Sequence, residues 1–291
     1  MNRPSEFSTF LSAAYSPAPR TNIGNLRNRG VEIDLSWKDR IGKLQYGFNM
    51  NGSFNTTNLE KWNQLLLRGN VFLEMPYQFV YSYQDNGIAQ SWADIYKNTP
   101  QGAAPGDLLM KDLNGDGRIT ADDRKAYSNL QQERPTTTFS FNTYVAYKGF
   151  DFTVFLQGAA GRKDYWQTIY NNTNFGNSRY AASWEHWTNP WSWDNRDGLW
   201  PRLGGSGNNR NQTSFWLDDM SYLRVKNLQL GYTVPTKVLS RLGVTNLRIV
   251  GSAENIGTLS AFRGLDPEKQ GDDNNVYPIN KSYSLAINLS F

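Results

Sequence analysis

The sequence predicts an all-β protein, an antiparallel up-and-down transmembrane β-barrel. Three observations predict this fold class: apolar and polar residues alternate along several stretches, the connections between these stretches alternate between short and long, and aromatic residues reach 14% of the chain although hydrophobic residues reach only 38%. Alternation places successive side chains on opposite faces of an extended strand. A barrel wall with one face in lipid and the other in water has this composition.

The alternation is clearest at the C-terminus. One face carries Tyr283, Leu285, Ile287, Leu289 and Phe291, and the residues between them are small or polar. Further strands are expected at 31–38, 44–54, 137–148, 150–158, 221–233 and 246–255, and the periodicity suggests about eight strands in all. Within 221–233 the apolar positions change parity, which predicts a β-bulge near Lys226 and Asn227.

The connections between the expected strands show a second regularity. Those at 39–43, 148–149 and 234–245 are short or moderate, whereas those at 55–136, 159–220 and 256–281 are long. In an up-and-down meander alternate connections lie at the same end of the sheet, and outer-membrane barrels have short periplasmic turns and long extracellular loops. We therefore expect three extracellular loops and a periplasmic C-terminus.

Lipid is the expected environment of one strand face. The strands have about the 9 to 11 residues that a spanning strand needs, and no run of about 18 apolar residues indicates a spanning helix. A soluble β-sandwich, whose strands alternate between core and solvent, is the alternative. Aromatic residues near strand ends favour the membrane, where they form girdles at the two interfaces. These residues are Phe139, Phe141, Tyr144, Tyr147, Phe150 and Phe152.

Composition argues against several other functions. The formal charge of +4 comes from dispersed side chains, so we expect no nucleic-acid partner. The chain has no cysteine and a single histidine, His186, which excludes thiolate and multi-histidine metal sites. The carboxylates of Glu32, Asp34 and Glu254 have the parity of the wet barrel wall, which explains them without glycosidase chemistry. We therefore expect that this chain is not an enzyme.

Residues 112–123 fit the spacing of a twelve-residue calcium loop. The expected ligands are the side chains of Asp112, Asn114, Asp116 and Asp123 and the carbonyl of Arg118. Position 12 is aspartate rather than the longer glutamate of an EF-hand. The alternative is a metal-free turn in which Asp and Asn side chains bond the backbone. We expect a structural calcium ion that braces the first long loop.

Four tryptophans in the second long loop, Trp184, Trp187, Trp191 and Trp193, are candidate substrate-binding residues. Sugar rings pack on tryptophan faces while their hydroxyls bond polar partners, so the cluster suits a carbohydrate platform. The simpler interpretation, which we favour, is that these rings pack on one another and anchor the loop.

Six segments carry a more specific pattern. They are 22–32 (N-x-G-x-x-x-N-x-G-x-E), 112–117 (D-x-N-G-D-G), 147–151 (Y-K-G-F-D), 222–232 (Y-L-R-x-K-N-x-x-L-G-Y), 264–268 (G-L-D-P-E) and the C-terminal Phe291. In this order they resemble the motifs of the SusC/RagA-type TonB-dependent outer-membrane transporters. No single motif is decisive, but the ordered set is specific and runs from about residue 20 to the end.

The resemblance implies a larger architecture than this chain. It implies a plugged barrel of about 22 strands, located in the cell outer membrane, of which 21–291 is the C-terminal portion behind a leading segment or loop at 1–20. It also implies a SusD-like surface lipoprotein over the mouth, contact with the TonB complex through an N-terminal part that this chain lacks, and import of glycans, oligosaccharides or peptides.

The chain alone is not expected to transport. Open sheet edges in lipid would leave backbone groups unpaired, each at a cost of several kcal/mol. The competing hypothesis is a secreted carbohydrate-binding β-protein, stabilised by calcium, in which the four tryptophans form a lectin-like site.

Overall fold

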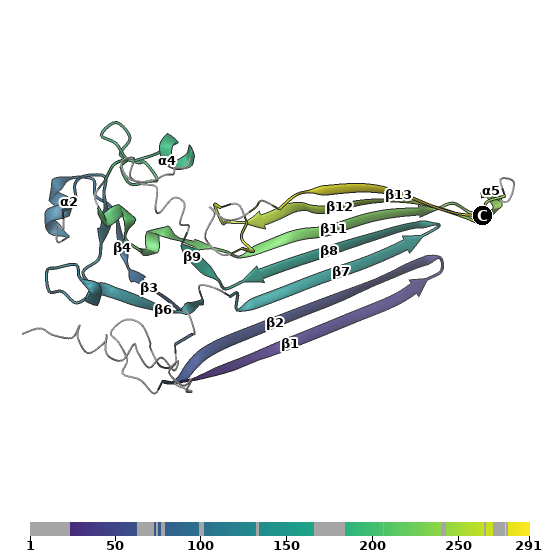
Figure 1. The fold of residues 1–291 in the computed structure, drawn as a ribbon, viewed down its shortest axis with the longest axis horizontal. Helices are drawn as coiled ribbons and strands as arrows, with labels where there is room; N and C mark the ends of the chain where they lie inside the picture. The colour runs from purple at the N-terminus through teal and green to yellow at the C-terminus, as the bar shows by residue number, and fades with distance from the viewer. Residues whose placement is uncertain are drawn as a thin grey trace, which may run out of the picture.

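The structure, a computed structural model, describes residues 24–62, 73, 75–76, 79–98, 102–131, 134–165, 184–205, 207–239, 243–264, 266–269, 277 and 279–291. The proposed leading segment at 1–20 lies outside these residues. One antiparallel sheet dominates the described part of the chain (Figure 1). Its strands, in spatial and chain order, are β1 (Gly24–Ile41), β2 (Leu44–Trp62), β7 (Thr137–Tyr147), β8 (Phe150–Ala160), β11 (Tyr222–Thr233), β12 (Asn246–Ser260) and β13 (Ser282–Ser290).

The meander order predicted from the sequence is confirmed, with two corrections. The sheet has seven strands rather than about eight. Strands β1, β2 and β12 also run further into the long-loop end than expected, so the long connections cover 63–136, 161–221 and 261–281 rather than 55–136, 159–220 and 256–281. The predicted bulge is present, since the pairing register of β11 with both neighbours shifts between Val225 and Asn227.

Short connections close the opposite end of the sheet. Strands β7 and β8 are joined by Lys148 and Gly149, with φ of 49° and 88°. Positive φ at both central residues is the signature of a type I′ turn, whose twist matches the paired strands. Gly42 and Lys43 join β1 to β2, and the connection from β11 to β12 holds the short helix α5 (Thr236–Leu239).

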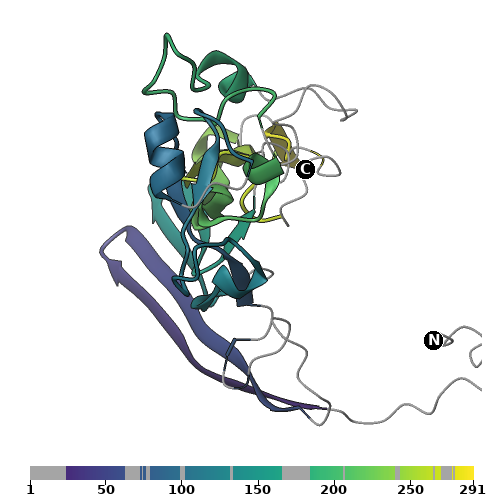
Figure 2. The same ribbon diagram turned by 90° about the vertical axis from the view of Figure 1, so that its left-hand side faces the viewer.

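The long connections form a separate structured region at the other end of the sheet (Figures 1 and 2). The first contains β3 (Phe79–Tyr83), β4 (Asp85–Ile88), α2 (Trp92–Lys97), β5 (Leu108–Met110), η1 (Ala121–Asp123) and β6 (Arg124–Gln131). The second contains β9 (Lys163–Tyr165), α4 (Trp184–Thr188), η2 (Gly207–Arg210), η3 (Ser214–Trp216) and β10 (Leu217–Asp219). Their gathering at one end confirms the expected alternation of loop lengths.

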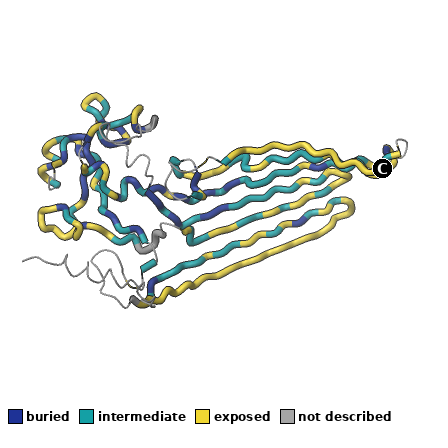
Figure 3. The backbone as a smooth tube through the Cα atoms, in the orientation of Figure 1, coloured by how far each residue is buried: buried dark blue, intermediate teal, exposed yellow. Residues whose placement is uncertain are grey.

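The best-packed core lies in this loop region and not on a face of the large sheet. Its buried residues come from both long connections and are Val80, Leu108, Tyr165, Trp200 and Trp216. Figure 3 shows the buried backbone concentrated there, whereas β1 and β13 are exposed along their length. No helix in the described ranges is long and apolar enough to cross a membrane.

Candidate functional site: a two-faced wall and its loop region

One face of the sheet is a continuous apolar surface. Pairing places Ile249 beside Ile287 and Leu247 beside Leu289, and the same parity continues across every strand pair to β1. These side chains are open to the surroundings: Leu285 is 73% exposed and Val31 62%. An apolar patch of this extent is rare on soluble monomers and marks a surface that another apolar phase covers.

The opposite face is polar and internally bonded. The amide of Asn49 donates to Asp34 at 3.2 Å, and Arg248 forms an ion pair with Asp151 at 2.7 Å. This ion pair reaches across β11 because Gly231 lies between the two side chains, and a Cβ there would approach the Asp151 carboxylate to 2.4 Å. Glu32 and Glu254 share this face by register, as their parity predicted.

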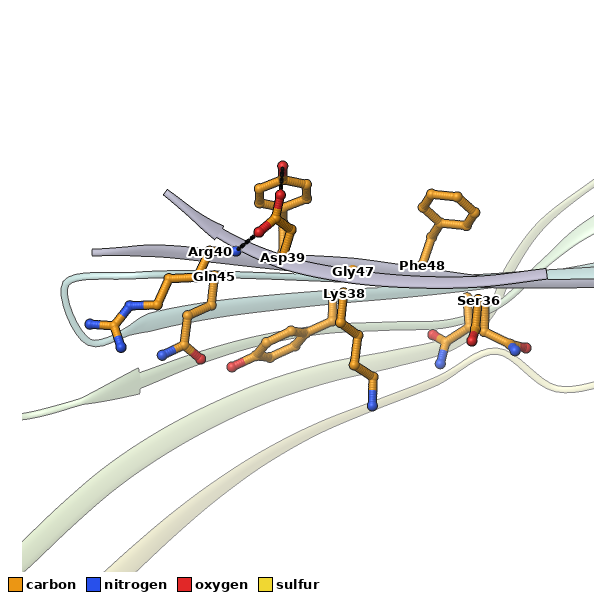
Figure 4. Close-up of a pocket in the computed structure, with 11 residues that line it drawn as sticks. Ser36, Lys38, Asp39, Arg40, Gln45, Gly47 and Phe48 are labelled. Carbon is orange, nitrogen blue, oxygen red and sulfur yellow. Dashed lines mark hydrogen bonds between the residues drawn. The ribbon is translucent and has the colours of Figure 1, made fainter. Parts of the chain in front are cut away.

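Figure 4 shows both faces at the end where the turns are short. Ser36, Lys38, Arg40 and Gln45 project on one side of β1 and β2, while Asp39 and Phe48 project on the other. The later strands, drawn in green and yellow, lie on the same side as Lys38 and Arg40 in this view. The sheet therefore curves with its polar face inward, as a barrel wall with a wet interior does.

The apolar band has the height of a bilayer core. On β1 the outward positions from Val31 to Ile41 are apolar except Asp39, whose carboxylate accepts a hydrogen bond from Tyr46 on β2 at 3.2 Å. This stretch matches the about 9 to 11 residues of a tilted spanning strand. One girdle assignment is wrong: Tyr144 pairs with Gly47 on the polar face, because its parity is opposite to that of Phe141 and Tyr147.

A buried ionic centre joins the two long connections of the loop region. Asp107 is fully buried and accepts hydrogen bonds from Arg202 Nε at 2.8 Å and Nη2 at 3.1 Å, from Asn209 Nδ2 at 3.0 Å and from the backbone N–H of Ala104 at 2.8 Å. Asn209 also accepts from the Leu108 N–H at 2.7 Å. The centre thus fixes β5 against η2.

A second ionic cluster attaches the third long connection to the wall. Arg224 of β11 is 3% exposed and pairs with Asp266 and Glu268, each at 2.6 Å. Lys226 reaches Glu268 at 3.1 Å, and Arg162 donates to the Lys269 carbonyl at 2.6 Å. Burial lowers the pKa of Arg162, and nearby Asp164 opposes that effect. The motifs at 222–232 and 264–268 are therefore the two halves of one contact.

The predicted calcium loop is a turn closed by its own side chains. Asp112 accepts from the N–H groups of Gly115 and Gly117 at 2.7 and 2.9 Å, and Asp116 accepts from the Arg118 N–H at 2.8 Å. Asn114 accepts from the Asp116 N–H at 2.9 Å. Among the described residues no group of three or more acidic, cysteine or histidine side chains converges as a metal site.

Asp123, the last residue of the predicted calcium loop, is fully buried. Burial favours its neutral form, but hydrogen bonds from the N–H groups of Thr120, Leu113 and Asn114 outweigh burial and lower its pKa. The carboxylate is therefore ionised at neutral pH, as a calcium ligand must be. The side-chain oxygens of this loop are of the type that calcium prefers. In this structure they accept hydrogen bonds from backbone N–H groups.

Two of the four candidate tryptophans line a cleft of about 470 Å³ in the loop region. Trp191 is buried at 3% and donates to the Gln90 side chain at 2.8 Å, while Trp193 is 59% exposed and packs edge-on against it at 5.2 Å. Trp92 of α2, which the sequence did not indicate, lines the same cleft. Trp187 is 53% exposed and is not among the residues that line this cleft. The side chain of Trp184 lies outside the described part of the structure.

The single histidine packs inside the loop region. His186 is fully buried beside Trp200, with 6.0 Å between ring centroids, and its Nε2 lies 3.1 Å from the Pro201 carbonyl, to which it donates. Burial lowers the pKa of His186, partly offset by this hydrogen bond. The ring is therefore a neutral structural residue.

Known proteins have similar sequences and a similar fold. TonB-dependent receptor P3 of Formosa agariphila is 29% identical over 315 residues, covering 93% of this chain and 29% of the receptor. TonB-dependent receptor SusC of Bacteroides thetaiotaomicron is 24% identical over 286 residues, covering 93% of this chain and 27% of SusC. The chain is similar in sequence to SusC and other TonB-dependent receptors. No family profile matches it.

The fold agrees with that of a solved transporter structure. The structure of the RagAB peptide transporter superimposes with a TM-score of 0.72 at 21% identity, covering 97% of this chain and 31% of that one. The antiparallel barrel predicted from the sequence is thereby confirmed, as is the resemblance drawn from its motifs. The chain spans about three tenths of the length of the SusC-type relatives it matches.

Several residues that organise this loop region were not predicted. Asp107, Arg202 and Asn209 stand 95 to 102 positions apart in pairs that touch, so nothing local in the sequence indicates them. The pairing of Arg224 with Asp266 could have been inferred, because each residue stands in one of the six family-like segments.

Proposed function

We propose that this chain supplies wall and extracellular mouth to an outer-membrane TonB-dependent importer of glycans, oligosaccharides or peptides. The observation that supports it is the two-faced sheet, apolar and exposed outside, polar inside, with every long connection at one end. The names of its relatives point the same way. In this proposal a SusD-like lipoprotein covers the mouth, and plug and TonB contact come from sequence outside this chain.

The cleft lined by Trp92 of α2 and by Trp191 and Trp193 is proposed as a substrate contact. Trp92 and Trp193 are 52% and 59% exposed, with Arg196 lying over the Trp193 ring, while Trp191 is buried and bonded to Gln90. Aromatic faces in a preformed cleft suit a sugar ring or an aromatic or prolyl side chain of a peptide. The simpler role, packing within the loop, applies to Trp191, which leaves Trp193 as the residue available to a ligand.

Uptake by cells that carry the complete barrel tests this function. Accumulation of labelled oligosaccharides and of labelled peptides is compared between cells with and without the barrel, and loss of neither upon deletion would contradict the importer. Trp193→Ala is expected to lower uptake at limiting substrate several-fold. Trp187→Ala, which removes a similarly exposed tryptophan outside the cleft, serves as the matched control. Equal effects of both changes would remove the cleft from the substrate path.

We also propose that calcium binds at residues 112–123 and braces the first long connection. Support comes from the ligand spacing and from the ionised carboxylate of Asp123. Calcium, but not the same concentration of magnesium, should slow hydrogen exchange across 112–123. Asp112→Asn should abolish the slowing, and Asp122→Asn, in the same loop but outside the ligand set, should leave it. Identical exchange with and without calcium would contradict a site.

A further inference from the structure

The extracellular ends of β1 and β2 carry a basic patch on the outward face. Beyond Val31, the last apolar outward position of β1, the same parity gives Arg29 and Arg27. Their partners on β2, Thr56 and Asn58, continue the outward face beyond Phe54 in the same way. The patch therefore lies directly above the apolar band, on the side where the long connections gather.

These residues surround a small recess of about 50 Å³. It is lined by Arg27, Arg29, Thr56, Asn58 and Glu60. Arg27 forms an ion pair with Glu60. Within the described ranges, Arg29 has no ion-pair partner and the buried side-chain oxygen of Asn58 has no hydrogen-bond partner. Among the described residues that line the recess, two arginines stand against one glutamate, which gives the recess a net positive charge.

The height of the patch matches a lipid headgroup. At about 3.3 Å per residue, Arg29 lies about 7 Å and Arg27 about 13 Å beyond Val31 along the strand. With a strand tilt of about 45°, these become about 5 and 9 Å above the hydrocarbon. The headgroup layer on each side of a bilayer is about 5 to 7 Å thick, so the backbone of Arg29 lies within this layer and that of Arg27 lies just beyond its outer edge.

We infer that Arg27 and Arg29 bind the phosphate of an outer-leaflet lipid headgroup. Guanidinium forks bind phosphate oxygens in pairs, and basic clusters beside an apolar surface recruit anionic lipids. The inference rests on the outer-membrane placement proposed above. A further strand beside β1 would leave both arginines outward, because side chains stand perpendicular to the sheet.

Native mass spectrometry of the complete barrel in neutral detergent tests the site, with dioleoylphosphatidic acid as the probe and dioleoylglycerol as its uncharged counterpart. Each arginine is expected to contribute about fivefold to phosphatidic acid affinity. The double change Arg27→Gln and Arg29→Gln should therefore weaken binding about 25-fold without affecting dioleoylglycerol. Lys38→Gln with Arg40→Gln removes the same charge from the polar face of the same strand and should leave affinity within twofold.

Each remaining outcome bears on the inference. Phosphatidic acid binding that survives the double glutamine change overturns it, and so does inorganic phosphate that binds as tightly as the lipid. Loss of a co-purifying protein with unchanged lipid binding assigns the patch to that protein instead. If the double variant fails to fold, Arg27→Gln and Arg29→Gln are made singly, and each should weaken phosphatidic acid binding about fivefold; unchanged binding in both single variants would overturn the inference. Absence of dioleoylglycerol binding to the unchanged barrel would count against the proposed membrane placement itself, separately from the arginine site.

Discussion

Removal of the Asp107 carboxylate should loosen the loop region without unfolding the wall. Asp107 is fully buried and accepts four hydrogen bonds, two of them from Arg202. Breaking a buried pair costs about 3 to 5 kcal/mol. Because the Arg202 side chain is 34% exposed, water can reach its guanidinium after the change. We therefore expect Asp107→Ala to cost about 3 kcal/mol, at the lower end of that range.

Hydrogen exchange of the folded barrel measures this cost locally. About 3 kcal/mol corresponds to roughly 100-fold faster exchange of the β5 amides, and in particular of the Leu108 N–H. The amides of β7 and β8 should keep their rates. Asp197→Ala, which removes an exposed carboxylate from the same region, should change exchange by no more than about twofold. A change below about fivefold in Asp107→Ala would refute the ionic centre as the tie between the two long connections.

Three further changes test other parts of the structure. Ile287→Arg should destabilise the barrel in lipid vesicles by about 2 to 4 kcal/mol, whereas Ala286→Arg on the polar face should cost under about 1 kcal/mol in a denaturant titration. Gly158→Ala should lower the free energy of unfolding by about 1 to 3 kcal/mol in the same titration, since its Cβ would lie 2.7 Å from the Tyr222 carbonyl oxygen. An unchanged midpoint would contradict this prediction and show that β11 moves to accommodate the methyl group. Stability of the loop region should fall as pH drops below about 6.5, because unfolded His186 takes up a proton that the buried ring, with its lowered pKa, resists. His186→Gln should flatten this pH dependence of hydrogen exchange, and an equal slope in both proteins would exclude the histidine.

The wall could be predicted from sequence because its signal is local. Every strand between lipid and water repeats apolar and polar residues with period two, and the change of parity at Lys226 was enough to locate the bulge. The extracellular ends of the strands were missed because this local signal is absent there. Past Val31, β1 continues through Arg27, Asn28 and Arg29, which are polar on both faces and carry no periodicity. Tyr144 was misplaced because closeness to a strand end was weighed above parity.

The loop region was largely beyond sequence reasoning. Its ionic centre joins Asp107 to Arg202 across 95 positions, and its core joins Leu108 to Trp216. Such contacts depend on how two long connections fold together, and no spacing rule reports them. The tryptophan segment shows the limit well: Trp191 packs inward and Trp193 faces outward, and the cleft they line also needs Trp92 from the other connection.

Depth-dependent fluorescence along β13 tests the two-faced wall most directly. The chain has no cysteine, so Leu285→Cys, Ser284→Cys, Ile287→Cys and Ala286→Cys each provide one labelling site for a bimane probe. In vesicles of brominated phosphatidylcholine, probes at 285 and 287 should be strongly quenched, while probes at 284 and 286 should be quenched by aqueous iodide instead. Equal quenching by both agents at all four positions would contradict an outward face in lipid and an inward face in water.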